Sequence, residues 1–599
     1  MTNSPVITGK LKQAVAAWID ADPDPADQER LADLLAAAKA GQPAAIAELT
    51  SAFAGPLEFG TAGLRGQIGP GPGRMNRAVV IRAAAGLTAY LMDGIVRTSA
   101  TGQPAQPAQQ TQPTQPVKVV IGYDARHGSA QFARDTAGVV VAAGGRAFLW
   151  QTDCPTPLLA YAVRQLKADA GVMVTASHNP ASDNGYKIYL GGRMATGPGE
   201  GVQIVPPADS EIAARIAAAP PANQVRRAQR GWQLIGPDLE REYSRQAVAG
   251  VAPVPGAADL RIVHTAMHGV GGRIALPVLA EAGFTDVHSV PAQLQPDPDF
   301  PTVAFPNPEE PGAIDLANGL AERIGADLVI AQDPDADRCA VSVYDPRAPQ
   351  GGGWRMLSGD ELGALLGEEA ARSWQDRPGV DGSVRPTLAA SIVSSRLLGR
   401  IARHHRLVFQ RTLTGFKWIA RTPGLVFGYE EAIGFCTRPD LVRDKDGITA
   451  ALAIARLAAR SKLAGTSLID LLDDLARRHG LHLTSQLAFR MADVSRLGET
   501  IRRLRRTAPE EIAGLPLTRT VDLAAGWEGL PPTDGLVFSL ADSSRVIVRP
   551  SGTEPKVKCY LEVVLPVAST ADFNALTAVR QEAADRLARL EQALTGLLS

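Results

Sequence analysis

Apolar and polar residues alternate with two different periods along the chain, which has 599 residues. Residues 9–54 and 78–97 carry apolar side chains at helical spacing, which predicts two or three amphipathic helices and then a further helix. Beyond Val117, short apolar runs that predict strands alternate with stretches that predict helices over 129–143 and 156–167. The strand runs are VKVVIGYD, RAFLW, AGVMV, LRIVHTAMHG, ADLVIAQD and TLAASIVSS. Strands that alternate with helices of this length favour parallel α/β units.

The length of the chain predicts about four domains. Candidate boundaries are stretches rich in proline or glycine, which lie near 219–224, 345–353 and 461–467. The expected domains cover residues 1–222, 223–350, 351–463 and 464–599.

The segment Thr101–Pro116, TGQPAQPAQQTQPTQP, stands apart from these patterns because it is mostly proline, glutamine and small residues. Such a composition cannot bury enough apolar surface to fold. We expect a disordered surface loop that contains no site residue and is dispensable for activity.

Composition excludes several classes of protein. The formal net charge is −1, so nothing in the overall charge indicates a nucleic-acid partner. The N-terminal residues contain no apolar signal region, and we found no unbroken apolar run of about 20 residues. The cysteines are far apart and predict reduced thiols in a large cytoplasmic protein; they are Cys154, Cys339, Cys436 and Cys559.

A first candidate site is TASHNPASDNGYK, which begins directly after the predicted strand AGVMV. Ser177 lacks the flanking glycines of a hydrolase elbow, and no Walker A loop is present. A serine of this kind can carry a phosphoryl group. Lys187 is a candidate acid or base if burial or neighbouring cations lower its pKa. His178 is either part of this chemistry or a structural histidine.

A second candidate site, DPDADR, follows the predicted strand that ends at Ala331. Carboxylates at alternate positions of a tight turn can converge on one hard cation such as Mg²⁺, and here they are Asp333, Asp335 and Asp337. An EF-hand loop would need glycine at 338 and glutamate at 344, where the chain has Arg338 and Tyr344. The alternative is a solvated acidic turn.

A third candidate site, RPSGTEP, lies between predicted strands at Val546–Val548 and Lys556–Val564. Its donors suit a phosphate-binding turn: a guanidinium, two hydroxyls and a flexible backbone, from Arg549, Ser551, Thr553 and Gly552. An ordinary hairpin turn is the alternative. In GYEEAIGF, adjacent Glu430 and Glu431 could bind sugar hydroxyls or form a solvated turn.

Taken in order, these motifs resemble the α-D-phosphohexomutase superfamily of phosphoglucomutases and phosphomannomutases. FGTAGLRG, which contains Arg65, resembles the arginine motif of that family, TLTGFK its sugar-specificity loop, and RDKDGI a loop with an active-site lysine. The resemblance extends from about residue 57 to about residue 565. It implies four α/β domains around a central active-site cleft, the first three with mixed or parallel sheets flanked by helices and the last an α+β domain.

The resemblance also implies roles for individual residues. Ser177 would be phosphorylated, and its phosphate would share Mg²⁺ with the three aspartates. Lys187 would be the general acid or base, beside Arg65 and His178. The implied substrate-binding residues are Arg338, Thr414, Gly415, Lys417, Glu430, Glu431, Lys445, Arg549, Ser551, Gly552 and Thr553.

The implied reaction interconverts a sugar 1-phosphate and a sugar 6-phosphate, with glucose as the leading sugar and glucose 1,6-bisphosphate as activator. Ala432 departs from many hexose enzymes, which have a serine there; with FGTAGLRG, this places the chain nearer the phosphoglucomutase/phosphopentomutase branch. A phosphopentomutase, a phosphomannomutase, a phosphatase and a silent sugar-phosphate sensor are the alternatives. The expected partners are small sugar phosphates, without nucleic acid or membrane, in a monomer or a weak homo-oligomer.

Overall fold

The computed structural model describes residues 7–100, 115–249, 253–348, 352–375, 385–490, 494–550 and 556–598. Within these ranges the chain forms two compact units. The first unit comprises Met1–Ala340 and Arg438–Leu452, and the second comprises Val341–Thr437 and Ala453–Ser599.

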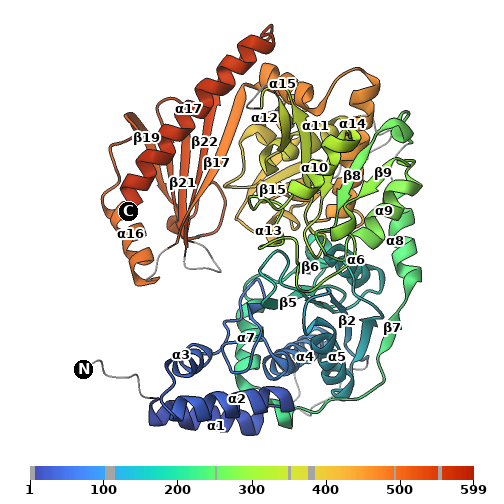
Figure 1. Ribbon diagram of the computed structural model, residues 1–599, viewed down its shortest axis with the longest axis vertical. Helices are drawn as coiled ribbons and strands as arrows, with labels where there is room; N and C mark the ends of the chain where they lie inside the picture. Colours follow the sequence, from blue (N-terminus) through green and yellow to red (C-terminus); the bar gives the residue numbers. More distant parts are fainter. Residues whose placement is uncertain are drawn as a thin grey trace. The chain divides into compact units, whose positions relative to one another are not determined.

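The first unit contains a seven-stranded mixed sheet (Figure 1). Its central strands run parallel, and β5 is antiparallel to β4. The strand order is β1 (Leu64–Gln67), β5 (Asp183–Leu190), β4 (Ala170–Val174), β2 (Lys118–Tyr123), β3 (Arg146–Trp150) and β7 (Gln233–Ile235), and β6 (Val202–Gln203) pairs with β5. These strands confirm the α/β pattern.

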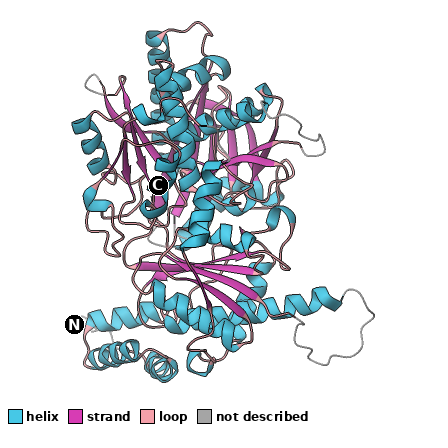
Figure 2. Cartoon of the chain, turned by 90° about the vertical axis from the view of Figure 1, so that its right-hand side faces the viewer, coloured by secondary structure: helices cyan, strands magenta, loops and turns pink. Residues whose placement is uncertain are grey.

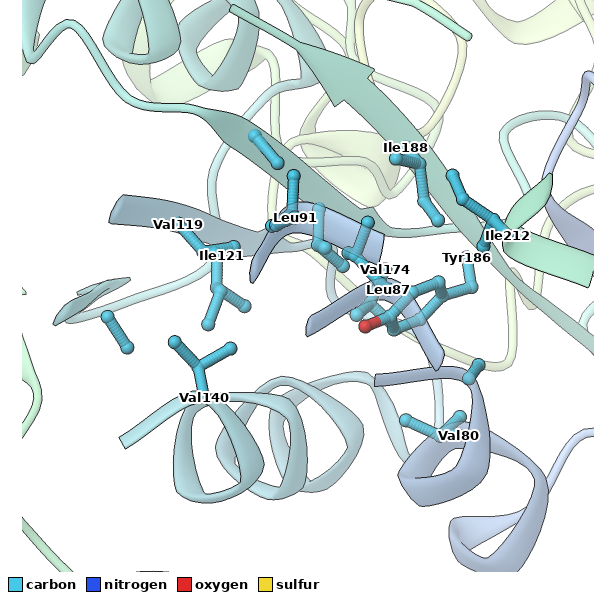
Figure 3. Packing of buried hydrophobic residues seen from close by; sticks show 14 of the residues in the cluster. Val80, Leu87, Leu91, Val119, Ile121, Val140, Val174, Tyr186, Ile188 and Ile212 are labelled. Atoms are coloured by element: carbon cyan, nitrogen blue, oxygen red, sulfur yellow. The ribbon is translucent and has the colours of Figure 1, made fainter. Parts of the chain in front are cut away.

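Helices cover both faces of this sheet (Figure 2). One face packs against α4 (Arg77–Ala100), α5 (Ser129–Ala142) and α7 (Ala208–Ala218), with Val119 and Ile121 of β2 in the core (Figure 3). The other face receives α6 (Thr156–Gln165), where a Cβ on Gly122 would lie 2.7 Å from Cys154 Sγ. Alternate residues of β2 therefore serve opposite faces, as the strand period requires.

By length and composition, α4 over Arg77–Ile95 could cross a membrane, although its apolar residues do not form an unbroken run. In the structure its Val80, Leu87 and Leu91 are buried against the sheet. Core packing therefore accounts for the apolar character of this helix.

Three helices precede the sheet and confirm the amphipathic pattern over 9–54: α1 (Gly9–Ala21), α2 (Pro25–Lys39) and α3 (Pro43–Ala52). They share a small apolar core that includes Val15, Leu31 and Leu49. The end of α3 supports the glycine-rich loop ahead of α4, because Arg74 Nη2 donates to Ser51 Oγ at 2.9 Å.

A second sheet of the first unit contains parallel strands in the order β10 (Leu328–Ala331), β8 (Ile262–Thr265) and β9 (Val287–Ser289). The accompanying helices are α8 (Pro237–Ala249), α9 (Gly272–Glu281) and α10 (Asp315–Ile324). The unit ends with residues 438–452, which include the start of α14 (Gly447–Leu463).

The second unit begins with strands β11 (Ala340–Asp345) and β12 (Gly353–Met356), which pair antiparallel. A four-stranded sheet follows in the order β14 (Val408–Thr412), β13 (Thr387–Ser391), β15 (Leu425–Glu430) and β16 (Gly434–Cys436). Its helices are α11 (Gly359–Gln375), α12 (Leu397–His404), α13 (Phe416–Ile419) and α15 (Leu468–His479).

The C-terminal part of the second unit is a six-stranded antiparallel sheet covered by α16 (Val494–Arg506) and α17 (Phe573–Leu598) (Figure 1). The strand order is β17 (Leu481–Arg490), β22 (Lys556–Leu565), β21 (Arg545–Pro550), β20 (Leu536–Leu540), β19 (Leu515–Asp522) and β18 (Glu511–Ile512). The sequence alternation in β22 suggests one buried face, but Tyr560 and Glu562 on its other face are buried too.

Short 3₁₀ helices connect several elements: η1 (Gly197–Gly199), η2 (Ala222–Gln224), η3 (Ala257–Asp259), η4 (Pro291–Gln293) and η5 (Leu523–Ala525). The predicted disordered loop lies outside the described residues except for its last two positions, Gln115 and Pro116. The four cysteines are buried free thiols, as predicted.

Candidate active site

Ser177 lies three residues beyond β4, in a loop whose backbone is held tightly. It is 3% exposed and has a φ of 51°, in the left-handed region that residues with a side chain seldom adopt. Its N–H donates to Thr175 Oγ1 at 2.9 Å, and its hydroxyl donates to Asp333 Oδ2 at 2.7 Å. The serine hydroxyl therefore points towards the turn that contains Asp333, Asp335 and Asp337.

The three aspartates after β10 converge as predicted. Asp333, Asp335 and Asp337 are fully buried, and each offers an oxygen within 4.8 Å of the others. The left-handed Ala336, with a φ of 54°, lies within this tight turn. Asp335 Oδ1 and Asp337 Oδ1 are buried with no hydrogen-bond partner among the described residues. Unsatisfied buried oxygens of this kind suit a hard divalent cation.

Burial and neighbouring charges shift the pKa values of these three carboxyl groups in different directions. Burial raises the pKa of Asp333 well above its ordinary value, and the charges of Asp335 and Asp337 add to the effect. For Asp335 and Asp337, burial also raises the pKa, and for Asp335 the charge of Asp337 adds to the effect. The ammonium of Lys187 helps to outweigh this, and the pKa of each ends below its ordinary value. Two buried carboxylates thus remain ionised: Asp335 beside Lys187, and Asp337 beside Lys187, Lys445 and Arg338.

Lys187 lies on β5 and is paired with the same turn. Its Nζ donates to Asp335 Oδ2 at 2.7 Å and to Asp337 Oδ2 at 3.1 Å. Burial lowers the pKa of Lys187, but the two carboxylates outweigh burial and raise the pKa above its ordinary value. The condition that burial or neighbouring cations lower this pKa is therefore not met, because two anions that the sequence does not reveal lie opposite the lysine.

Lys445 approaches the turn from residues 438–452. Its Nζ is 3.2 Å from Asp337 Oδ2. The aspartates on either side of it are anchored by buried tyrosines: Tyr189 donates to Asp444 Oδ2 at 2.8 Å, and Tyr243 donates to Asp446 Oδ2 at 2.7 Å. The sequence analysis missed both tyrosines: Tyr243 lies far from every motif, and Tyr189 lies two positions after Lys187 but belongs to no motif.

Thr156, at the start of α6, is a third residue that the sequence analysis missed. Its hydroxyl donates to Asp335 Oδ2 at 2.7 Å, and its N–H donates to the Asp335 carbonyl at 2.9 Å. Both contacts fix the middle aspartate of the turn. A threonine at a helix start has no distinctive sequence signal, because it is also a common cap.

Arg65, His178 and Arg338 surround Ser177 and the carboxylates. Arg65 Nη1 donates to Asn179 Oδ1 at 3.1 Å, and Arg338 Nε is 3.8 Å from Asp333 Oδ2. His178 Nδ1 is 3.2 Å from Ser177 Oγ. Burial, with the charges of Arg338 and Arg65, holds the pKa of His178 well below its ordinary value. The histidine is therefore neutral at pH 7.

In the second unit, Glu430 ends β15 and Glu431 begins the turn to β16. Glu431 Oε2 accepts hydrogen bonds from Ser391 Oγ at 3.1 Å and Ser394 Oγ at 3.0 Å. Burial raises the pKa of Glu431 to about 7, with the charge of Glu430 adding to the effect. Glu431 is thus held by serines.

The remaining predicted residues also belong to the second unit. Gly415 has a φ of 102° and precedes α13, so glycine is required where Thr414 leads into Lys417. Arg549 lies near the end of β21, opposite Lys558 of β22, and is half-buried. Ser551, Gly552 and Thr553 lie outside the described residues.

The structure therefore brings together, within the first unit, the serine, the three aspartates and the surrounding cationic and imidazole groups. The predicted sugar and phosphate residues are located in the second unit. Arg126 is a fourth residue that sequence analysis missed: it donates to backbone carbonyls of the Ser177 loop.

Four family models match the chain in order. They describe phosphoglucomutase/phosphomannomutase α/β/α domain I over 56–221, domain II over 243–346, domain III over 358–479 and the C-terminal domain over 501–580. These matches support the four-domain α/β fold.

Two curated relatives cover most of the chain. A "Probable phosphomannomutase" of Haemophilus influenzae is 42% identical over 490 residues, which is 82% of this chain and 93% of the relative. A "Phosphopentomutase" of Mus musculus is 33% identical over 604 residues, with 93% and 91% coverage. Among solved structures, a putative phosphomannomutase from Thermus thermophilus superposes with a TM-score of 0.62, at 22% identity and with 89% and 99% coverage. That last likeness concerns the fold.

Proposed function

Since this chain belongs to the phosphoglucomutase/phosphomannomutase family, we propose that it interconverts glucose 1-phosphate and glucose 6-phosphate through a phosphorylated Ser177. The enzyme is a mutase of the phosphohexomutase type, an isomerase that moves a phosphoryl group within a sugar phosphate. The proposal adds the sugar, the covalent intermediate and the residues that act.

The observation that carries the proposal is the hydrogen bond of 2.7 Å from Ser177 Oγ to Asp333 Oδ2. It holds a buried hydroxyl against the edge of a three-carboxylate cluster. A phosphoryl group on that oxygen would lie beside the cation that such a cluster suits.

Asp333, Asp335 and Asp337 would hold Mg²⁺ together with an oxygen of the phosphate on Ser177. The unpartnered oxygens of Asp335 and Asp337 support this assignment. When bound, Mg²⁺ supplies positive charge to the phosphate oxygens. Zinc suits the cluster less well, because it prefers cysteine and histidine ligands.

The residues of the chain then handle the proton and the phosphoryl group. The bond between Ser177 Oγ and phosphorus breaks as a sugar hydroxyl oxygen bonds to phosphorus. Lys187, 2.7 Å from Asp335 Oδ2, would move the proton between the sugar hydroxyl and the serine oxygen. Arg65, Arg338 and neutral His178 would surround the transferring group.

The product of this step is a sugar bisphosphate that must bind in either orientation. Arg549 with Ser551, Gly552 and Thr553 would hold the phosphate that is not reacting, since this motif suits an anion. Glu430, Glu431, Thr414, Gly415 and Lys417 would bind the sugar, and Lys445 would complete the active site. Glucose 1,6-bisphosphate would act as activator by phosphorylating an empty Ser177.

A phosphopentomutase is the second candidate function. Ala432 supplies no hydroxyl at the position where many hexose enzymes have a serine, so one polar contact to a hexose is missing. The relative from Mus musculus, which is 33% identical and covers 93% of this chain, has the name phosphopentomutase. Both observations favour a site that accepts ribose 1-phosphate.

Turnover of glucose 1-phosphate, ribose 1-phosphate and mannose 1-phosphate on one preparation tests the substrate. The highest kcat/KM for glucose 1-phosphate would support the proposal, and a higher value for ribose 1-phosphate or mannose 1-phosphate would replace it. Mass spectrometry of the peptide that contains Ser177 tests the intermediate in the same preparation. Sustained release of inorganic phosphate would instead indicate a phosphatase.

A further inference from the structure

Arg126 lies behind the Ser177 loop and donates to four of its backbone carbonyls. Nη2 donates to the carbonyls of Ser177 at 2.7 Å and Asn179 at 2.6 Å. Nη1 donates to the carbonyls of Pro180 at 2.7 Å and Asp183 at 3.1 Å. Arg126 is 3% exposed, so these contacts are shielded from water. Only a guanidinium offers enough donors in one plane for this arrangement.

The topology of the sheet explains why Arg126 reaches this loop. Arg126 follows β2, and Ser177 follows β4, which is the parallel neighbour of β2. Loops at the carboxyl ends of adjacent parallel strands lie side by side. The two loops are joined by the Asp124 N–H, which donates to the Val174 carbonyl at 3.1 Å.

Arg126 is itself held in place from two further sides. Its Nε is 3.4 Å from Asp124 Oδ2, and Asp124 Oδ1 accepts from Ser129 Oγ at 2.7 Å. The guanidinium carbon lies 5.0 Å from the centre of the Phe300 ring. The arginine is therefore a fixed support and not a flexible surface side chain.

The contacts matter most at Ser177, whose φ of 51° persists only if its surroundings hold it. The N–H of Ser177 is held by Thr175 Oγ1, and its carbonyl is held by Arg126. Both peptide groups that flank the serine are thus fixed, and the direction of the hydroxyl towards Asp333 follows from them.

We propose that Arg126 is a positioning residue for phosphoryl transfer: it fixes the backbone of Ser177 so that the serine oxygen meets the reacting group in line. The inference rests on the proposed function, in which Ser177 carries the phosphoryl group. The contacts described for Arg126 are with the loop and with its own supports, so its effect is exerted through Ser177.

Two substitutions test the proposal in the full-length enzyme. Arg126→Met keeps the length of the side chain and removes charge and donors, whereas Arg126→Lys keeps the charge but donates from a single nitrogen that cannot span four carbonyls. Misplacement of a reacting atom by about 1 Å costs about 100-fold in rate. We expect kcat to fall by about that factor in both variants, with KM for glucose 1-phosphate changed less than about threefold, because other loops bind the sugar phosphate.

Arg193→Lys is the matched control. Arg193 also pairs with a carboxylate, Asp169, and donates to two carbonyls, those of Gln115 at 3.2 Å and Pro116 at 3.0 Å. None of these contacts reaches the Ser177 loop. We expect its kcat to stay within about twofold of wild type, so a loss confined to the Arg126 variants is not a general cost of replacing a bonded arginine.

Two further measurements separate positioning from a general loss of structure. Single-turnover transfer from glucose 1,6-bisphosphate to dephosphorylated Ser177, followed by intact mass, should slow by the same factor as kcat. Amide hydrogen exchange of the peptide over 175–183 should accelerate, while the peptides of α5 and β3 exchange as in wild type.

The proposal is overturned if Arg126→Lys, shown to be folded by its thermal unfolding curve, keeps kcat within about threefold of wild type. It is also overturned if KM rises as much as kcat falls, or if exchange at 175–183 is unchanged. If Arg126→Met does not fold, Arg126→Lys decides the question alone. A wild-type protein without phosphate on Ser177 after the same treatment would overturn the proposed function and the positioning role together.

Discussion

The serine and carboxylate loops of the first unit are more deeply buried than those predicted sugar and phosphate residues of the second unit that the structure describes. Ser177, Lys187 and the three aspartates are all buried and linked by direct hydrogen bonds or ion pairs. Glu430 and Arg549 are only half-buried. A step that is common to every sugar phosphate needs fixed geometry, whereas recognition of one sugar in two orientations needs accessible groups. The difference matches the roles proposed for the two sets of residues, a rigid chemical centre and an adjustable recognition surface.

The largest expected effect is the loss of the nucleophile of the rigid centre. Ser177→Ala should lower kcat by about 10⁴-fold or more, since it removes the oxygen that carries the phosphoryl group in the proposed reaction. Turnover of glucose 1-phosphate measures the loss, and intact mass should show no phosphate. Ser182→Ala, an exposed serine five residues away, is the control and should retain wild-type turnover. A Ser177→Ala protein with near-normal activity would refute the intermediate.

The next effect concerns the carboxylate cluster. Removal of divalent cations with EDTA should lower kcat by about 10²–10³-fold, because the cation contributes several kcal/mol to stabilising charge in phosphoryl transfer. Added Mg²⁺ should restore the rate. Asp337→Asn should weaken Mg²⁺ binding in a calorimetric titration, independently of activity. Full turnover in excess EDTA would mean that the cluster does not hold a catalytic cation.

Arg549 tests the recognition surface. Arg549→Ala removes a charge-assisted contact of roughly 1.5–3 kcal/mol, which corresponds to a rise in KM of about 10–100-fold. Either isomer used as starting substrate should show the rise, because the bisphosphate binds in both orientations. Mg²⁺ affinity should stay unchanged. Normal binding of sugar phosphates by the folded variant would mean that this turn is only a hairpin.

The smallest effect is the pH dependence of Glu431, whose pKa burial raises to about 7, with the charge of Glu430 adding to the effect. A carboxyl group with a raised pKa holds its proton more tightly in the folded state, so ionisation destabilises the fold as pH rises from the unfolded pKa to about 7. The Glu431→Gln variant has no carboxyl group to ionise at this position, so it does not lose stability in this way. The thermal midpoint of the variant relative to wild type should therefore increase between pH 5 and pH 8. A difference that does not change with pH would place the ionised form in a solvated site.

Sequence patterns predict the strands, most helices and the convergence of the aspartates, because each depends on neighbouring residues. DPDADR places carboxylates at alternate positions of one turn, and a strand period is legible in VKVVIGYD. The order of the strands in each sheet is not contained in these local patterns.

The supports of the site could not be predicted for the same reason. Thr156 meets Asp335 across 179 positions of sequence, and Tyr243 meets Asp446 across 203. The pKa of Lys187 likewise depends on a distant segment. Burial lowers this pKa, but two carboxylates outweigh burial and raise it. A useful signal existed for Arg126: GYDAR and TASHNP both follow predicted strands of one α/β unit, and such loops meet when the strands are neighbours.

The chain passes from the first unit to the second after Ala340, returns at Arg438 and leaves again after Leu452. Until residues 438–452 have been synthesised, Tyr189 and Tyr243 lack their aspartate acceptors and Lys445 does not exist. At the usual pace of a ribosome, this delay after residue 340 is roughly 10 s. The nascent first unit therefore spends that interval with its candidate active centre incomplete, and a fragment that stops at residue 340 should lack Lys445 and both aspartate acceptors however long it is given.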